Sequence, residues 1–433
     1  MGGSFASTST PVALTRRPSR SSFSCLSRVL VLLAAAVVLL VVFYGVYTTY
    51  SSSFSSPVVD SRSRLPPRHP GRLPDATFYD EPSLSYAIDR PVADWDAKRQ
   101  EWRRLNPHLA GDSQRILMVS GSQPGPCRNS VGDHLLLRLF KNKADYCRRH
   151  GIELFYNTAL LHPKMDFYWA KIPVIRAAML AHPEAEWVWW VDSDAAFTDM
   201  DLELPMGRYQ FHNMVLHGWA HLVYEKRSWV SVNAGVFLIR NCQWSLDFMA
   251  EWASMSPLSP DYASWGKILK AELNDKLFNE SDDQSALVYI LLKQNARWGD
   301  KIYLESEFEL ESYWLKTLGR LEELAGAYAA VERQEEGMLR KHAEAASRAY
   351  GRMREKLMGA EKRRRPLITH FTGCQPCSGE HNEMYTAESC WEGMQRALHF
   401  ADDQVLRDYG FRHVDLLTAD VIPLPSDYPA ATS

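Results

Sequence analysis

Two aspartates separated by one residue are the first feature that could do chemistry. Asp192-Ser193-Asp194 follows the apolar run Trp187–Val191, which predicts a buried strand. On a regular strand, alternate side chains point to opposite faces, so these carboxylates can converge only where the strand ends and the backbone turns. There, two hard oxygen ligands would hold Mg²⁺ or Mn²⁺, and the metal would stabilise a diphosphate leaving group.

Two other interpretations fit a DxD sequence. Such a pair is common in turns and at the first residues of helices. Phosphatases of the haloacid dehalogenase type also place DxD after an apolar strand, normally the first strand and with Thr or Val two residues past the second Asp. Here that position is Ala196 and the strand is the third, so a metal site is the favoured interpretation.

Two further polar segments precede apolar runs. In 228–239, Asn233 and Gly235 would let the backbone approach a ligand, or they simply begin an ordinary strand. The acidic sequence Asp282-Asp283-Gln284 precedes the apolar run 286–292, which predicts a helix N-cap or a carboxylate at a reacting centre. Both roles can hold together, with Asp282 capping the helix and Asp283 pointing inward.

Cysteines and histidines cluster near the C-terminus. His370 and His381 lie among cysteines that could form a zinc site, but disulfides are favoured in an oxidising compartment. A lone histidine such as His370 is more often structural than a ligand. The disulfide candidates are Cys127, Cys147, Cys242, Cys374, Cys377 and Cys390. The sequon Asn279-Glu280-Ser281 predicts a glycosylation site at Asn279.

The elements that must position these residues alternate along the chain. Strands are predicted at 116–119, 152–156 and 187–191, with helices at 130–150 and 168–181 between them. This order predicts a parallel sheet covered by helices, in which ligands bind at the carboxyl ends of the strands. Both the loop at Gly121 and the DxD segment lie at such ends.

The N-terminal part predicts a membrane anchor. Residues 29–47 form a 19-residue run without a charge, long enough to cross a bilayer. The only charged residues before Asp60 are four arginines on its N-terminal side, which predicts a cytosolic N-terminus and a type II orientation. A cleaved signal peptide is the alternative, but its apolar region is usually shorter.

A short helix is expected around 95–105. The predicted organisation is a cytosolic tail at 1–28, the span, a stem at 48–110, a lumenal catalytic domain at 111–425 with a charged helical insertion at 318–365, and a tail at 426–433.

Composition limits the class of protein. The chain has 433 residues, of which 46% are hydrophobic and 23% charged, and these globular values exclude a wholly disordered or fibrous protein. The net charge is −3, which argues against broad nucleic-acid binding. The 14 tryptophans suit the recognition of sugar rings, although Trp also fills cores.

Five segments in a fixed order resemble one family. They are 189–195, 228–235, 241–245, 281–284 and 370–374. The chain resembles plant glycosyltransferase family 34, the xyloglucan xylosyltransferases and galactomannan galactosyltransferases, over about 115–423. The resemblance implies an α/β fold of the GT-A (Rossmann-like) type behind the membrane anchor and stem. It also implies a single-pass type II protein of the Golgi membrane, a UDP-sugar donor, Mn²⁺ (or Mg²⁺), and retention at an α-1,6 linkage onto a β-1,4-glucan or β-1,4-mannan.

The resemblance also implies roles for single residues. Asp192 and Asp194, with Ser193 between them, match the metal-binding motif, and His370 matches the histidine that completes it. The residues that match the donor site are Gly121, Ser122, Lys171 and the Cys-x-Pro-Cys position Gln375. Asp282, Asp283 and Gln284 match the acidic loop near the anomeric carbon, where retention proceeds by front-face return or through a transient nucleophile.

The donor sugar is left open between xylose and galactose. Xylosyltransferases of the family typically have Lys where this chain has Gln375, so the chain resembles the galactomannan galactosyltransferase branch more. The main hypothesis is a Golgi enzyme of hemicellulose synthesis, acting on xyloglucan or galactomannan. The alternative is a non-catalytic scaffold for active relatives, and pairing with itself or related transferases is compatible with both.

Overall fold

The computed structural model describes residues 84–109, 115–307, 309–333 and 364–424. The chain divides into Met1–Asp75 and Ala76–Ser433, and every described residue belongs to the second unit. The predicted cytosolic tail, the span at 29–47, the tail at 426–433 and most of the charged insertion lie outside the described residues. Within the described ranges, no helix has the length and apolar character needed to span a membrane.

A six-stranded sheet forms the centre, with the strand order β2-β1-β3-β6-β5-β7. Its strands are β1 (Ile116–Gly121), β2 (Glu153–Asn157), β3 (Trp187–Val191), β5 (Met214–Gly218), β6 (Val232–Arg240) and β7 (Ile302–Glu305). β1 is parallel to β2 and β3, as predicted. β6 runs antiparallel to both β3 and β5, whereas β7 is parallel to β5, so the sheet is mixed and the prediction of a parallel sheet is wrong at β6. β6 begins beside the end of β5, where Gly218 pairs with Val232, so the two strands run antiparallel.

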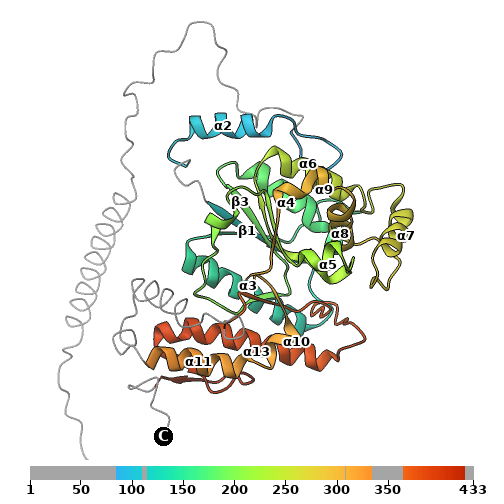
Figure 1. Ribbon diagram of the computed structural model, residues 1–433. Coiled ribbons are helices and arrows are strands. Elements are labelled where there is room, and N and C mark those ends of the chain that lie inside the picture. The colour runs from blue at the N-terminus through green and yellow to red at the C-terminus, as the bar shows by residue number, and fades with distance from the viewer. Residues whose placement is uncertain (1–83, 110–114, 308, 334–363, 425–433) are drawn as a thin grey trace, which may run out of the picture. The chain divides into compact units, whose positions relative to one another are not determined.

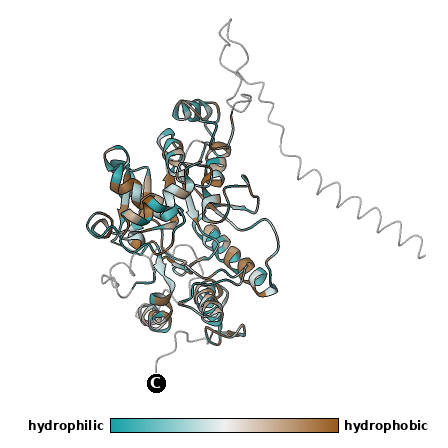
Figure 2. Cartoon of the chain, turned by 90° about the vertical axis from the view of Figure 1, so that its right-hand side faces the viewer, coloured by the Kyte–Doolittle hydropathy of each residue, from teal (hydrophilic) through white to brown (hydrophobic). Residues whose placement is uncertain are grey.

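Helices cover both faces of this sheet (Figure 1). On one face lie α4 (Lys171–Ala181), α6 (Gln243–Ala253) and α8 (Asp283–Lys293), and on the other lies α3 (Ser130–His150). Alternate residues of β3 enter the two cores, Val188 and Trp190 on the first face and Trp187 and Trp189 on the second. Figure 2 shows the matching division on the helices, which have a hydrophobic side and a hydrophilic side.

The remaining elements are short or peripheral. The other α-helices are α2 (Trp95–Leu105), α5 (Ala220–Tyr224), α7 (Tyr262–Glu272), α9 (Asn295–Trp298), α10 (Trp314–Leu318), α11 (Leu321–Arg333) and α13 (Ala387–Leu406). The 3₁₀ turns are Phe167–Ala170, Met206–Tyr209, Trp229–Ser231, Gly299–Lys301 and Arg407–Tyr409. The helix predicted at 168–181 is therefore a 3₁₀ turn followed by α4.

A second, small sheet brings distant segments together beside the first. It has the order β4-β9-β8, from β4 (Ala195–Phe197), β9 (Ile368–His370) and β8 (Ser312–Tyr313). β4 pairs with β9 so that Ala195 lies opposite His370. A hairpin of β10 (Phe411–His413) and β11 (Val421–Pro423) follows α13.

Local sequence explains where the main helices begin and end. The Asn129 side chain accepts a hydrogen bond from the Gly132 amide at 2.7 Å and caps α3, which ends at Gly151 with φ +64°. These bounds are the predicted ones. Thr386 and Ser389 form a capping box at the start of α13.

The helix at 95–105 is part of the folded unit rather than of a flexible stem. Trp95 is fully buried and its indole donates to Asn241 Oδ1 at 2.7 Å. Arg99, also buried, donates to the carbonyl oxygens of Pro183 and Ala185 at 3.0 and 2.7 Å. The predicted stem at 48–110 is therefore too long at its C-terminal end.

Two disulfides are formed, Cys127–Cys377 and Cys374–Cys390. Cys147 and Cys242, which were also candidates, are free thiols, so the prediction is wrong for them. Cys147 faces the core from α3, with its sulfur 3.5 Å from that of Met118. Cys242 occupies the N-cap position of α6, with its sulfur 3.4 Å from the Ser245 hydroxyl. Because Cys374 and Cys377 are both oxidised, the alternative zinc site lacks its thiolates.

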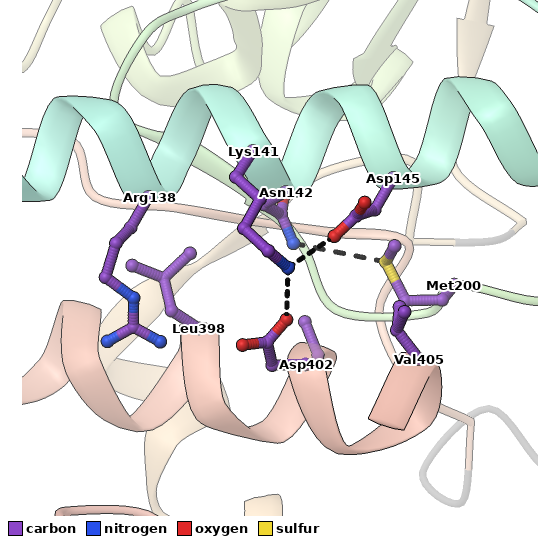
Figure 3. A pocket seen from close by; sticks show the side chains of 9 residues that line it. Arg138, Lys141, Asn142, Asp145, Met200, Leu398, Asp402 and Val405 are labelled. Atoms are coloured by element: carbon purple, nitrogen blue, oxygen red, sulfur yellow. Dashed lines mark hydrogen bonds and ion pairs between the residues drawn. The ribbon is translucent and has the colours of Figure 1, made fainter. Parts of the chain in front are cut away.

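The seam between α3 and α13 contains a small pocket (Figure 3). Lys141 of α3 spans it, with Nζ 2.6 Å from Asp145 and 2.7 Å from Asp402. None of the predicted site residues lines this pocket. Lys141 therefore joins α3 to α13 across this pocket, which lies apart from the predicted site residues.

Candidate active site

The DxD sequence lies in a turn between β3 and β4. The Asp192 amide donates to the Gly235 carbonyl of β6 at 2.8 Å, and the Ala195 amide donates back to the Asp192 carbonyl at 3.2 Å. The Trp190 indole donates to Asp192 Oδ1 at 2.5 Å. The strand has therefore ended, and both half-buried carboxylates can face the same side, as the metal interpretation requires.

His370 completes a three-residue cluster. Its Nε2 lies 3.2 Å from Asp194 Oδ1 and 3.8 Å from Asp192 Oδ2. One ligand atom from each of the three residues lies within 4.8 Å of the others, which is the spacing of a metal site. Two carboxylates and an imidazole suit Mn²⁺ better than Mg²⁺, because Mg²⁺ is usually held by oxygen atoms alone.

The electrostatics of this cluster favour charged groups. Burial alone would lower the pKa of His370, but Asp194 and Glu311 outweigh burial and raise the pKa to about 10. Burial opposes the charged form of Asp194 as well, yet His370 and Lys143 hold the pKa of Asp194 below its usual range. A metal must therefore displace a proton from His370 to bind there.

Lys171, predicted as a donor-site residue, is buried between two parts of the site. Its Nζ lies 2.6 Å from Asp283 Oδ2 and 3.4 Å from Asp192 Oδ1, and it donates to the Ala234 carbonyl at 2.8 Å. The side chain is only 3% exposed. Lys171 therefore joins the DxD turn to the acidic loop, which are separate in sequence.

The two acidic-loop aspartates have different roles. Asp282 caps α8 by accepting from the Ser285 amide at 2.9 Å, and it also accepts from Lys276 and the Trp229 indole at 2.7 and 3.1 Å. Asp283 points inward to Lys171, and burial raises the pKa of Asp283 to about 6 despite that lysine. This is the division of roles that the sequence suggested, with Asp283 as the reactive candidate.

Gln284, Asn233 and Gly235 build the wall beside the cluster. The Gln284 side chain donates to the Trp229 carbonyl at 3.0 Å and accepts from the Ala234 amide at 3.2 Å. Asn233 Nδ2 lies 3.2 Å from His370 Nδ1. A Cβ added at Gly235 would lie 2.3 Å from His370 Cε1 and 2.5 Å from Asp192 Oδ2, so Gly235 leaves the space that the metal ligands occupy.

The other predicted residues lie apart from this cluster or have structural roles. Gly121 ends β1, where a Cβ would lie 2.5 Å from the Asn157 carbonyl oxygen, and the Ser122 amide donates to that oxygen at 3.0 Å. Gln375 is exposed in the disulfide-bonded segment, with its carbonyl 3.1 Å from the Ser378 hydroxyl. Asn279 is exposed and accepts from Lys270 at 2.8 Å. Their binding and glycosylation roles stay predictions.

Two buried residues at the site were not predicted. Lys143 is fully buried under the turn and donates to the carbonyl oxygens of Ser193 and Ala195 at 3.1 and 2.7 Å. Burial lowers the pKa of Lys143 to about 8, although Asp194 and Asp192 oppose this shift. Its place on the apolar face of α3, with Leu139 and Tyr146, was a usable signal. Glu311, 3.6 Å from His370 Nδ1, had no such signal.

Comparison with known proteins places the chain in a family. Residues 112–381 match the galactosyl transferase GMA12/MNN10 family. The chain is 60% identical to probable glycosyltransferase 7 of Oryza sativa subsp. indica, over 82% of each chain, and 56% identical to galactomannan galactosyltransferase 1 of Cyamopsis tetragonoloba, over 85% of each. It is 50% identical to glycosyltransferase 6 of Arabidopsis thaliana, over 94% of this chain and 96% of that one. These matches confirm the resemblance found in the sequence, and the chain belongs to the galactosyl transferase GMA12/MNN10 family of glycosyltransferases.

Proposed function

We propose that this glycosyltransferase moves galactose or xylose from a UDP-sugar onto a β-1,4-glycan in hemicellulose synthesis, with retention and an α-1,6 linkage. The observation that carries the proposal is the convergence of Asp192, Asp194 and His370, with Asp283 joined to them through Lys171. The 56% identical relative is named a galactomannan galactosyltransferase, which supports galactose and a mannan backbone.

The residues of the cluster fit a divalent metal. Asp192, Asp194 and His370 would hold Mn²⁺ or Mg²⁺, which when bound supplies Lewis-acid stabilisation of the diphosphate leaving group. In the reaction, the bond from the anomeric carbon of the sugar to the UDP oxygen breaks and a bond from that carbon to the acceptor hydroxyl oxygen forms. UDP and the proton of that hydroxyl are released. The GT-A assignment is part of this proposal.

Asp283 has the geometry to act at the sugar. Its carboxylate is buried and held by Lys171, which also lies 3.4 Å from Asp192 of the DxD turn. A negative charge there would stabilise the positive charge that develops at the anomeric carbon. This role serves both front-face return and a transient covalent bond to Asp283, whereas Gln284 uses its side chain to hold the neighbouring loop.

The cellular setting is proposed from the sequence. The apolar run at 29–47 and the arginines before it support a single-pass type II protein of the Golgi membrane, with the active site in the lumen. The two disulfides agree with an oxidising lumen.

A donor and acceptor screen tests the function. The full-length protein, expressed in a secretory system and purified in detergent, would be assayed with UDP-galactose and UDP-xylose against manno- and cello-oligosaccharides in the presence of Mn²⁺. We expect transfer of galactose to manno-oligosaccharides, lost in Asp194→Ala with an unchanged circular dichroism spectrum. Tight UDP binding without transfer for any pair would favour the scaffold alternative.

A further inference from the structure

The Nδ1 atom of His370 has two neighbours, a hydrogen-bond donor and a hydrogen-bond acceptor. Nδ1 lies 3.2 Å from the Asn233 side-chain nitrogen and 3.6 Å from Glu311 Oε1. The other nitrogen, Nε2, faces the carboxylates of Asp192 and Asp194. A neutral imidazole carries one proton, so the partner of Nδ1 decides whether Nε2 has a free lone pair for a metal.

Asn233 favours the tautomer that cannot bind. Its Oδ1 accepts from the amides of Gly235 and Val236 at 2.8 and 3.0 Å, and these two bonds assign the NH₂ group to the side that faces His370. A donor at this position favours a bare Nδ1. The proton then lies on Nε2, where it excludes a metal.

Glu311 favours the opposite tautomer. A carboxylate oxygen accepts hydrogen bonds, so Glu311 stabilises a proton on Nδ1 and leaves Nε2 free. The two atoms are 3.6 Å apart, within ion-pair distance, and a shift of about 0.5 Å would bring them into hydrogen-bond distance. The pairing of β8 with β9 places Tyr313 beside His370, and this register brings Glu311 within reach.

Glu311 is buried beside two histidines, His370 and His217. Glu311 is buried, and no opposite charge on Arg or Lys lies within ion-pair distance among the residues described around it. His217 is also close to it, but burial lowers the pKa of His217 and keeps that imidazole neutral. His217 therefore does not neutralise the carboxylate.

We propose that Glu311 is a positioning residue, which orients His370 and selects the tautomer that binds the divalent metal through Nε2. This inference rests on the proposed function, since it assumes that Asp192, Asp194 and His370 hold a metal. Outer carboxylates that accept from a metal-binding histidine typically change metal affinity by about 10- to 100-fold.

The test measures Mn²⁺ affinity directly, by the EPR signal of free Mn²⁺ with the full-length protein in detergent. We expect Glu311→Leu to weaken Mn²⁺ binding roughly 10-fold or more, and Glu311→Gln to weaken it less, because its amide oxygen still accepts a hydrogen bond. Glu307→Gln removes an exposed carboxylate of the same region and should leave the affinity unchanged. In transfer assays, Glu311→Gln should raise the Mn²⁺ concentration for half-maximal rate while kcat at saturating Mn²⁺ stays near that of wild type.

The outcomes separate this inference from the function it rests on. Wild-type affinity in both Glu311 variants, together with weakened binding in Asp194→Ala, would overturn the role of Glu311 alone. Equal Mn²⁺ binding by Asp194→Ala and wild type would instead remove the metal site itself. If Glu311→Leu does not fold, the isosteric Glu311→Gln decides, and a fall in its kcat without a change in Mn²⁺ dependence counts against positioning.

Discussion

A proton and a metal compete for His370. In the metal-free protein the neighbouring carboxylates raise the pKa of His370 to about 10, so at neutral pH the ring holds the proton that a metal must displace. Mn²⁺ affinity should therefore increase with pH, by up to about tenfold per pH unit for one displaced proton. Titrations at pH 6, 7 and 8 would measure this slope. The variant His370→Asp should show a flatter slope, and a wild-type affinity independent of pH would contradict the prediction.

Gly235 is required by the space between His370 and Asp192, the proposed metal ligands. A methyl group there would lie 2.3 Å from His370 Cε1 and 2.5 Å from Asp192 Oδ2, closer than atoms can approach. Gly235→Ala should therefore push the ligands apart, weaken Mn²⁺ binding at least roughly 10-fold and reduce transfer in parallel.

Gly326 in α11 provides the matched control, because a Cβ added there meets no atom within 4 Å. Gly326→Ala should leave metal binding unchanged and stabilise the helix by about 1 kcal/mol. A Gly235→Ala protein that binds Mn²⁺ like wild type would show that the ligands move aside at little cost.

At the scale of elements, α2 belongs to the catalytic unit. Trp95 is fully buried and Arg99 bonds to three carbonyl oxygens of the segments around β3 and β6. Trp95→Ala should lower the free energy of unfolding by about 3–5 kcal/mol, through lost burial and the loss of the indole donor to Asn241 Oδ1. Chemical denaturation of the purified protein would measure the loss.

Trp102, half-buried on the same helix, is the matched comparison. Trp102→Ala should cost clearly less than Trp95→Ala, because it removes less buried surface. Equal costs for the two variants would mean that α2 does not dock through Trp95. An expressed chain that begins after α2 should be less stable for the same reason.

The second sheet is the element that assembles the site. Antiparallel pairing of β4 with β9 places His370 opposite Ala195, next to Asp194, and parallel pairing of β8 with β9 brings Glu311 close. The reversed direction of β6 matters equally, because it starts beside the end of β3 and puts Gly235 against Asp192. Three strand pairings, two antiparallel and one parallel, therefore bring these residues together at the DxD turn.

At the scale of the whole molecule, buried histidines set the response to acid. His399 Nδ1 donates to the Leu416 carbonyl at 2.9 Å, and His399 Nε2 accepts from the Arg138 guanidinium at 3.1 Å, which is the arrangement of a neutral ring. Burial, Arg138 and the stacked His413 lower the pKa of His399 below that of an unfolded chain. The unfolded chain therefore takes up this proton first as pH falls, so the group reduces stability below about pH 6.5.

The variant His399→Gln should be less sensitive to acid than wild type. Between pH 6.5 and pH 5, the slope of the free energy of unfolding against pH should become shallower. The change in slope should be at most that caused by the uptake of one proton, as measured by denaturation at each pH. At pH 8, where both forms are neutral, the two proteins should differ only by the cost of the changed contacts. An unchanged slope would place the acid sensitivity in other buried groups, such as His150 and His217, whose pKa values are also lowered by burial.

Local patterns were enough to predict the first half of the fold and the chemistry of the site. Apolar periodicity and caps placed the helix at 130–150 and the strand at 187–191 at their observed bounds, because short-range packing and hydrogen bonding decide those features. The DxD pair was identifiable because it directly follows an apolar run, and the acidic sequence at 282–284 because it directly precedes one. Carboxylates at such positions commonly cap a helix or bind a ligand.

The tertiary structure alone decided which of these residues meet. Strand direction, the pairing of β4 with β9, the choice of four cysteines out of six, and the burial of Lys143 and Glu311 depend on contacts between segments far apart in the chain. No local periodicity records such contacts, because each segment can satisfy its own hydrogen bonds and apolar face with several partners. Amino-acid types therefore determined what the site can bind, and the packing of distant segments determined where and with which supporting groups it binds.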